Sequence, residues 1–176
     1  EELREVLSGH ICRCTGYAGI MASALGQLNA GITTTCDMSQ INHTPTHTDA
    51  MIQALKDAGR RSVFAYSPSD GPNSQFPQDI YRLRRQYFSS SDQLLTLAMH
   101  VPTSTSPTTN FPIARDVGAP ITSHISGPIM SLYNAGLMGP DNTYIHCTSL
   151  TNDEWQAIAD TGGTVSIAGP IEMSMG

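Results

Sequence analysis

The chain has 176 residues, of which 39% are hydrophobic and 14% are charged, and its formal net charge is −6 at pH 7. This composition excludes a disordered chain, and the length suits one domain with a buried core. The acidic balance, with a single lysine, argues against a nucleic-acid-binding surface. No apolar run approaches the ~20 residues of a membrane span and no secretory signal is present, so we expect a cytoplasmic protein without membrane contact.

Residues 1–20 differ from the rest of the chain and are expected to form a separate tail. Cys12 and Cys14 stand one residue apart and supply two of the four thiolates that a [2Fe–2S] centre needs. The segment resembles the C-terminal end of the iron–sulfur small subunit of the xanthine dehydrogenase and carbon monoxide dehydrogenase family, where these cysteines match the last two ligands of the second cluster. The other cysteine pair of that family is absent, so we expect no [2Fe–2S] cluster here.

From residue 21 on, short β-rich runs alternate with helical segments. The pattern predicts strands near residues 32–37, 62–66, 94–100, 120–125, 143–148 and 164–168, and helices near residues 21–30, 47–58, 78–88, 111–117, 128–137 and 152–161. Such alternation is typical of right-handed parallel βαβ units. Six strands are too few for a closed eight-stranded barrel. We therefore expect residues 21–176 to form one α/β domain, either an open sheet or a partial (β/α)8 barrel, with no helix after the last strand.

Polar side chains fall at the predicted carboxyl ends of four strands. They are Asp37, His100, His124 and His146, and Glu172 follows the last strand. Sites in parallel α/β folds are built at these ends, and neighbouring strands lie ~4.8 Å apart. Imidazoles and a carboxylate can hold Zn²⁺ or Fe²⁺, which lowers the pKa of a bound water to about 7, while a second carboxylate or histidine moves the proton. The alternative is that each histidine is a satisfied polar residue at a strand end.

Four further residues carry chemistry but fall outside this set. Cys36 and Cys147 each neighbour a candidate site residue, and because side chains alternate along a strand we expect both to be core thiols. His43 and His47 fall in a loop and at a helix start, where we expect surface positions.

From about residue 24 on, the chain resembles the middle of an amidohydrolase-superfamily enzyme of the chlorohydrolase and cytosine-deaminase-like group. The resemblance rests on phrases in the family's order, at residues 25–34 (LGQLNAGITT), 37–39 (DMS), 54–60 (ALKDAGR), 136–147 (GLMGPDNTYIHC) and 159–168 (ADTGGTVSIA). It implies a distorted (β/α)8 barrel with a metal at its top. His124 matches the metal ligand of the fifth strand, and His146 matches the sixth-strand histidine, which polarises the substrate or binds a second metal.

The sequence departs from this family in three places. It lacks the His-x-His pair of the first strand and the aspartate of the eighth, and Gly127 stands where many deaminases carry a proton-shuttling glutamate. We therefore expect Zn²⁺ or Fe²⁺ to bind weakly or not at all.

Three functions follow from these observations. The first is a metal-dependent hydrolase acting on the C–N bond of a small molecule (a cyclic amide, amidine or aminated heterocycle), with His146 and Asp37 as catalytic residues and His100, His124 and His146 as metal ligands. The second is a non-catalytic barrel fragment that forms homo-oligomers through its open sheet edges. The third, resting on Cys12 and Cys14 alone, is an iron–sulfur electron carrier.

Overall fold

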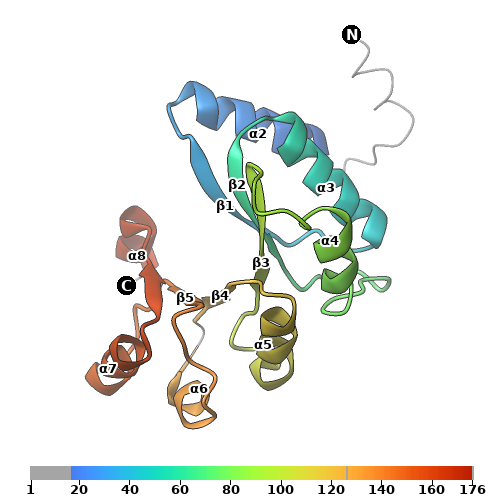
Figure 1. Ribbon diagram of the computed structural model, residues 1–176. Coiled ribbons are helices and arrows are strands. Elements are labelled where there is room, and N and C mark those ends of the chain that lie inside the picture. Colours follow the sequence, from blue (N-terminus) through green and yellow to red (C-terminus); the bar gives the residue numbers. More distant parts are fainter. Residues whose placement is uncertain (1–16, 126, 176) are drawn as a thin grey trace.

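The computed structural model describes residues 17–125 and 127–175 of the chain (Figure 1). The helix expected at residues 1–7 and the Cys12–Cys14 pair lie outside these residues. Within the described part, strands and helices alternate from the first helix to the last. None of the helices in this part is long and apolar enough to cross a membrane.

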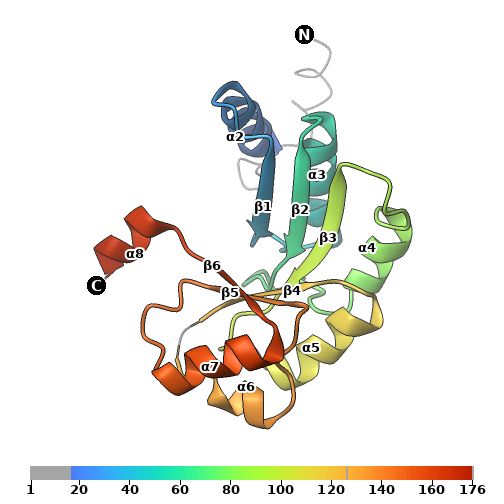
Figure 2. The same cartoon turned by 60° about the vertical axis from the view of Figure 1, so that its left-hand side comes forward.

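The six strands form one sheet in which every strand is parallel to its neighbours and the spatial order follows the chain order. Figure 2 shows the sheet curving through space from β1 to β6. The strands are β1 (Thr34–Ser39), β2 (Arg61–Tyr66), β3 (Leu95–His100), β4 (Ile121–His124), β5 (Asn142–Ile145) and β6 (Thr164–Ser166). The prediction of a partial (β/α)8 barrel is confirmed.

A helix precedes the first strand, one lies in each connection, and one follows the last strand. They are α2 (Tyr17–Asn29), α3 (Pro45–Asp57), α4 (Ile80–Gln86), α5 (Pro107–Asp116), α6 (Met130–Asn134), α7 (Asn152–Thr161) and α8 (Gly169–Met175). Helices α3 to α7 cover the outer side of the curved sheet (Figures 1 and 2). The inner side stays open as a cavity of about 580 Å³, lined by residues from all six strands.

Local sequence signals set the ends of these helices. Gly59 and Gly162 follow α3 and α7 with φ of +63° and +73°, a conformation that favours glycine over other residues. At the start of α7, the Thr151 hydroxyl accepts from the Glu154 N–H and the Glu154 carboxylate accepts from the Thr151 N–H, which is a capping box. Both stop signals were expected from the sequence.

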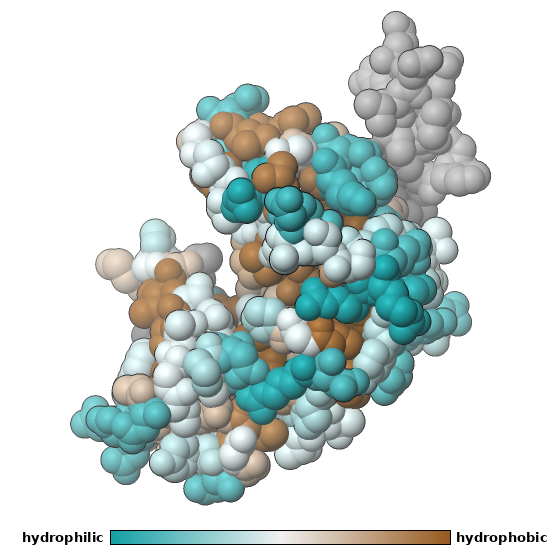
Figure 3. Space-filling view, in the orientation of Figure 1, coloured by the Kyte–Doolittle hydropathy of each residue, from teal (hydrophilic) through white to brown (hydrophobic). Residues whose placement is uncertain are grey.

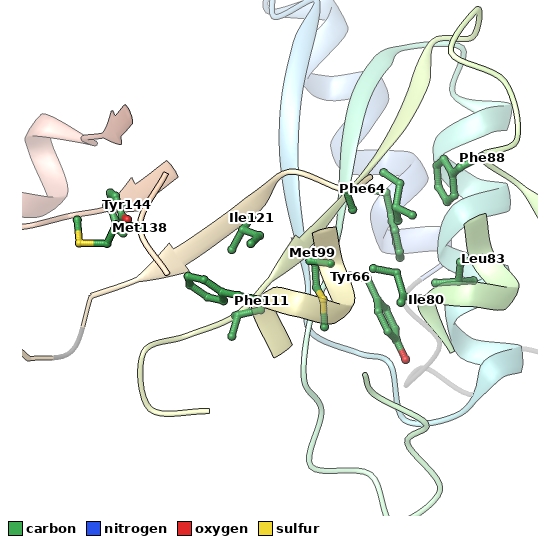
Figure 4. Packing of buried hydrophobic residues seen from close by; sticks show 14 of the residues in the cluster. Phe64, Tyr66, Ile80, Leu83, Phe88, Met99, Phe111, Ile121, Met138 and Tyr144 are labelled. Carbon is green, nitrogen blue, oxygen red and sulfur yellow. The ribbon is translucent and has the colours of Figure 1, made fainter. Parts of the chain in front are cut away.

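The hydrophobic core lies between the sheet and its outer helices. Phe64, Tyr66 and Met99 point from β2 and β3 toward Ile80 and Leu83 of α4 (Figure 4), and each of these side chains is at most 1% exposed. The core continues along β4 and β5 through the remaining labelled residues, which include Phe111, Ile121, Met138 and Tyr144. This continuous core runs along β2 to β5.

The structure corrects several predicted elements. Helix α2 begins at Tyr17 and α5 at Pro107, each four residues before the predicted start. Strand β1 spans Thr34–Ser39 rather than residues 32–37, and β5 ends at Ile145, one residue before His146. Helix α8 was not expected, and its Gly169–Pro170 start is a pair that usually marks a turn. Proline is nevertheless well tolerated in the first helical turn, where its missing N–H has no partner to lose.

Candidate functional site

Three histidines from consecutive units lie side by side at the carboxyl edge of the sheet. His100 and His124 end β3 and β4, and His146 directly follows β5. The ring centroids are 4.8 Å apart for His100 and His124 and 5.1 Å apart for His124 and His146. His124 therefore lies between the other two, as the strand order requires.

The strand register places the three rings in a staggered row, in which His124 lies two residues beyond the level of His100. His100 pairs with Thr122 across the β3–β4 ladder, and His124 pairs with Ile145 across the β4–β5 ladder. His146 and Cys147 then take φ of +74° and +60°, values that are rare for residues other than glycine. The chain therefore turns sharply at His146, where the sequence predicted that the strand continues.

Two hydrogen-bond chains hold the histidine rings through their Nδ1 atoms. Nδ1 of His100 lies 3.0 Å from the Thr122 hydroxyl, which in turn donates to the Met38 sulfur of β1 at 3.4 Å. Nε2 of His100 lies 3.0 Å from Nδ1 of His124. The first chain thus runs from β1 across β4 and β3 and ends at His124.

The second chain begins at Glu172 of α8, and it serves His146. Nδ1 of His146 lies 2.9 Å from Oε1 of Glu172, and the same oxygen accepts from the Ala168 N–H at 3.0 Å. The second carboxylate oxygen is buried and has no hydrogen-bond partner among the described residues. Sequence reasoning placed Glu172 near the last strand but did not connect it to His146, because the two residues are 26 positions apart.

Burial sets the protonation of His100 and His124, and hydrogen bonds set that of Glu172. His100 is 1% exposed, and burial, followed by the neighbouring His124, lowers its pKa to about 4. Burial, followed by the charge of His146, also lowers the pKa of His124. The Ala168 N–H and then His146 lower the pKa of Glu172. At neutral pH, His100 and His124 are therefore neutral and Glu172 is ionised.

Asp37, predicted to join this site, lies on the opposite face of the sheet. It lines a cavity of about 380 Å³ together with Arg60 and residues of α2, and its carboxylate accepts from the Ser39 hydroxyl. Burial raises its pKa, which the Ser39 bond and the Arg60 charge partly offset. Because side chains alternate along a strand, Cys36 and Met38 take the inner face that the histidines use. The structure does not bring Asp37 to the histidines.

The two cysteines and the two outlying histidines differ from one another in setting. Cys147 is buried in the core as predicted, whereas Cys36 is exposed because the inner face of β1 is uncovered; the prediction for Cys36 was wrong. His43 bonds Ser69 and lines a cavity of about 260 Å³ beside His100. His47 bonds Thr44 at the start of α3 and is only partly buried.

The histidine cluster does not fit a complete catalytic zinc site. In residues 17–125 and 127–175, no three His, Cys, Asp or Glu side chains are placed to hold one ion. The facing nitrogens of His100 and His124 bond each other at 3.0 Å and do not converge on a shared point. A catalytic zinc normally has three protein ligands. Among the described residues, His124 and His146 thus remain as ligands, whereas the Nε2 atom of His100 is occupied by its bond to His124.

Comparison with solved structures shows a shared fold. A triazine hydrolase variant aligns with a TM-score of 0.79 at 18% identity over 99% of this chain and 48% of its own. An amidohydrolase from an environmental sample of the Sargasso Sea aligns with a TM-score of 0.71 at 20% identity over 90% and 44%. An atrazine chlorohydrolase from Arthrobacter aurescens, complexed with zinc, aligns with a TM-score of 0.74 at 18% identity over 92% and 44%.

These alignments extend over nearly the whole of this chain but less than half of each solved structure. No family model and no curated protein matches the sequence. At these identities the likeness concerns the fold alone: the chain shares the architecture of somewhat less than half of each solved structure.

Proposed function

We propose that this chain is the histidine-bearing half of a hydrolase of the amidohydrolase type, acting on the C–N bond of a small molecule such as a cyclic amide, amidine or aminated heterocycle. The observation that carries the proposal is the contact of His100, His124 and His146 at the carboxyl edge of a parallel sheet. The architecture shared with the triazine hydrolase and the chlorohydrolase supports it. Neither nucleic acid nor membrane is part of this proposal.

Hydrolysis of a C–N bond adds the oxygen of water to carbon and leaves the nitrogen with an additional proton. An imidazole that is neutral near pH 7 is suited to take a proton from water and to return it to the leaving nitrogen. His146 is better placed than His124 for this work, because the Glu172 carboxylate holds its ring through a bond of 2.9 Å at Nδ1, whereas Nδ1 of His124 faces a second imidazole. Asp37, on the far face, has no part in the proposed reaction.

Zinc is the ion that the comparison with the zinc-bound chlorohydrolase supports. When bound, it would activate water for attack. His124 is the described residue that would contribute a ligand. His146 would contribute a second ligand only in place of its role in proton transfer, because Nδ1 bonds Glu172 and Nε2 cannot hold zinc and a proton at once. The other ligands would have to come from outside the described part. We therefore derive no step through the ion and propose weak zinc binding by the chain alone.

The test is to measure retained zinc and ammonia release together. The chain and the variants His124→Ala, His146→Ala and His47→Ala are incubated with Zn²⁺, desalted and examined by mass spectrometry. They are then assayed against a panel of amino-substituted heterocycles and amidines, whose hydrolysis releases ammonia. We expect partial zinc occupancy that falls in His124→Ala and His146→Ala but not in His47→Ala, whose ring bonds Thr44 outside the cluster. Equal zinc in all four proteins, without ammonia release, would end the proposal.

A non-catalytic, self-associating fragment is the second candidate, and the open sheet favours it. Strands β1 and β6 each have one neighbour among the described strands, and exposed apolar side chains flank both. These side chains are Leu25 and Ile32 near β1, and Ile167 and Met173 after β6. Figure 3 shows apolar surface on α2 and around β6. Unpaired edges promote association. Sedimentation as a homo-oligomer without zinc or turnover would support this candidate, and a monomer would exclude it.

The tail is also part of the proposal. We propose that residues 1–20 are a segment of separate origin, whose last four residues form the start of α2, and that they carry no iron–sulfur cluster. Visible absorbance with acid-labile sulfide, lost in Cys12→Ser, would instead support the electron carrier.

A further inference from the structure

We infer that two independent hydrogen-bond chains, Met38–Thr122–His100 and Glu172, hold His124 and His146 in the tautomer that carries its proton on Nδ1, which leaves Nε2 of both rings with a free lone pair. This makes His100 a positioning residue and not a ligand. The inference deepens the proposed function, on which its consequence for ligand binding rests, but the proton positions themselves can be measured without any substrate or metal.

Met38, at the end of the first chain, sets the direction in which its hydrogen bonds are donated. The thioether sulfur of Met38 has no proton to give, so it can only accept. The Thr122 hydroxyl has one proton, which it donates to that sulfur at 3.4 Å. The Thr122 oxygen must then accept from His100, whose Nδ1 lies 3.0 Å away. Nδ1 of His100 therefore carries a proton.

Burial carries this assignment to the next ring. His100 is 1% exposed, and no carboxylate contacts it among the described residues, so a charged imidazolium there would be costly. A neutral ring with its proton on Nδ1 has a lone pair on Nε2. That lone pair faces Nδ1 of His124 at 3.0 Å, so Nδ1 of His124 must be the donor. The remaining nitrogen of His124, Nε2, then has the lone pair.

The second chain reaches the same result by a different route. An ionised carboxylate only accepts hydrogen bonds. Oxygen Oε1 of Glu172 takes the Ala168 N–H at 3.0 Å and faces Nδ1 of His146 at 2.9 Å. Nδ1 of His146 therefore carries the proton, and Nε2 of a neutral His146 has the lone pair.

The two chains act on adjacent rings whose centroids are 5.1 Å apart. Which ring nitrogen is protonated is set by the bond that the other nitrogen makes, and each chain fixes that bond. Without these chains, Nε2 of His124 or of His146 could carry a proton and present an N–H instead of a lone pair. With them, both present an acceptor at once, which suits a Lewis acid or the proton of a bound water.

The experiment is long-range ¹H–¹⁵N NMR of the metal-free chain labelled on histidine nitrogen, which shows which nitrogen of each ring carries the proton. Signals are assigned from those lost in His124→Gln and His146→Gln. We expect His100, His124 and His146 all to carry the proton on Nδ1. A proton on Nε2 of His124 or His146 in the unaltered chain would overturn the inference, whether or not the chain proves to be a hydrolase.

Two variants separate the chains. Met38→Leu removes the acceptor at the end of the first chain and frees the Thr122 proton to point at His100. We expect His100 and His124 to change to the opposite tautomer or to a mixture, while His146 keeps its own. Glu172→Ala should change His146 alone. Met51→Leu, at a core methionine of α3 that is 1% exposed, is the matched control and should change none. Unchanged signals in Met38→Leu would show that Met38 does not set the direction.

Discussion

Glu154 connects the two loops that follow β4 and β5, and its removal gives the sharpest test of how this half of the sheet is held. One carboxylate oxygen accepts from the Ile129 N–H at 2.7 Å, and the other accepts from the Thr151 N–H and hydroxyl, each at 2.9 Å. Glu154 is 4% exposed and Ile129 is fully buried. The carboxylate therefore ties the chain after His124 to the helix after His146.

The cost of Glu154→Ala can be worked from these bonds. The Ile129 N–H would be left buried without a partner, at about 1–3 kcal/mol. Thr151 is exposed, so water replaces the carboxylate there, and the loss of the capping box adds about 1 kcal/mol. We expect the free energy of unfolding to fall by about 2–4 kcal/mol. Glu154→Gln keeps one acceptor oxygen and should lose about half as much.

The matched control is Asp153→Ala, because Asp153 lies in the same first turn of α7 but is exposed. It should cost no more than about 1 kcal/mol through the helix dipole. Urea unfolding is followed by the fluorescence of Trp155, the only tryptophan, which neighbours Glu154. A loss in Glu154→Ala no greater than that in Asp153→Ala would refute the reasoning.

Three further outcomes follow from single groups. The Tyr144 hydroxyl is buried without a hydrogen-bond partner among the described residues, so Tyr144→Phe should raise the free energy of unfolding by about 1 kcal/mol, and a fall in urea unfolding would contradict this. Arg115 holds Asp141 through two bonds of 2.7 and 3.0 Å at half-buried positions, so Arg115→Met should cost about 1–2 kcal/mol in the same assay, with equal stability as the contrary result. Backbone N–H groups lower the pKa of Glu154, so its stabilisation is present above the ordinary value of 4.5 and is lost as the pH falls below it. The difference in free energy of unfolding between the unaltered chain and Glu154→Gln should therefore decrease in urea titrations from about pH 5 to about pH 3. An increase of this difference would contradict the prediction.

Most of the fold could be predicted from local patterns. The run Leu94–His100 is apolar on both faces, as a buried parallel strand requires, and glycines after the helices supply the stops. Helix α8 was not predicted; Gly169 and Pro170, a pair that usually marks a turn, open a helix here. The carboxylate of Glu172 shows why this matters to the site: α8 carries it back to His146, and no local pattern predicts a contact across 26 residues.

The misplacement of Asp37 has a different cause. Successive side chains of a strand point to opposite faces of the sheet, so a shift of one residue in the assignment exchanges the two faces. The run Thr33–Met38 places Asp37 opposite Cys36 and Met38, but the pattern does not tell which of the two faces is the inner one. Only packing decides it: α2 and Arg60 cover the face of Asp37, and the inner cavity receives Met38. Met38 then contacts Thr122, which joins β1 to β4 although the two residues are 84 positions apart in the sequence.

The backbone conformation at His146 shows why its place at the end of a strand could be predicted from the sequence but the orientation of its ring could not. Had β5 continued, His146 and Cys147 would alternate between the two faces of the sheet. Both instead have positive φ, a strained state that costs about 1–3 kcal/mol per residue and persists only where the surroundings hold it. The His146 N–H donates to the Ser166 carbonyl at 3.1 Å, and the Cys147 side chain is 2% exposed in the core. Those two contacts fix the turn, and the turn gives the His146 ring both Glu172 and His124 as neighbours. Strain that brings a histidine to a carboxylate on one side and to a second imidazole on the other is better explained by a functional site than by packing alone.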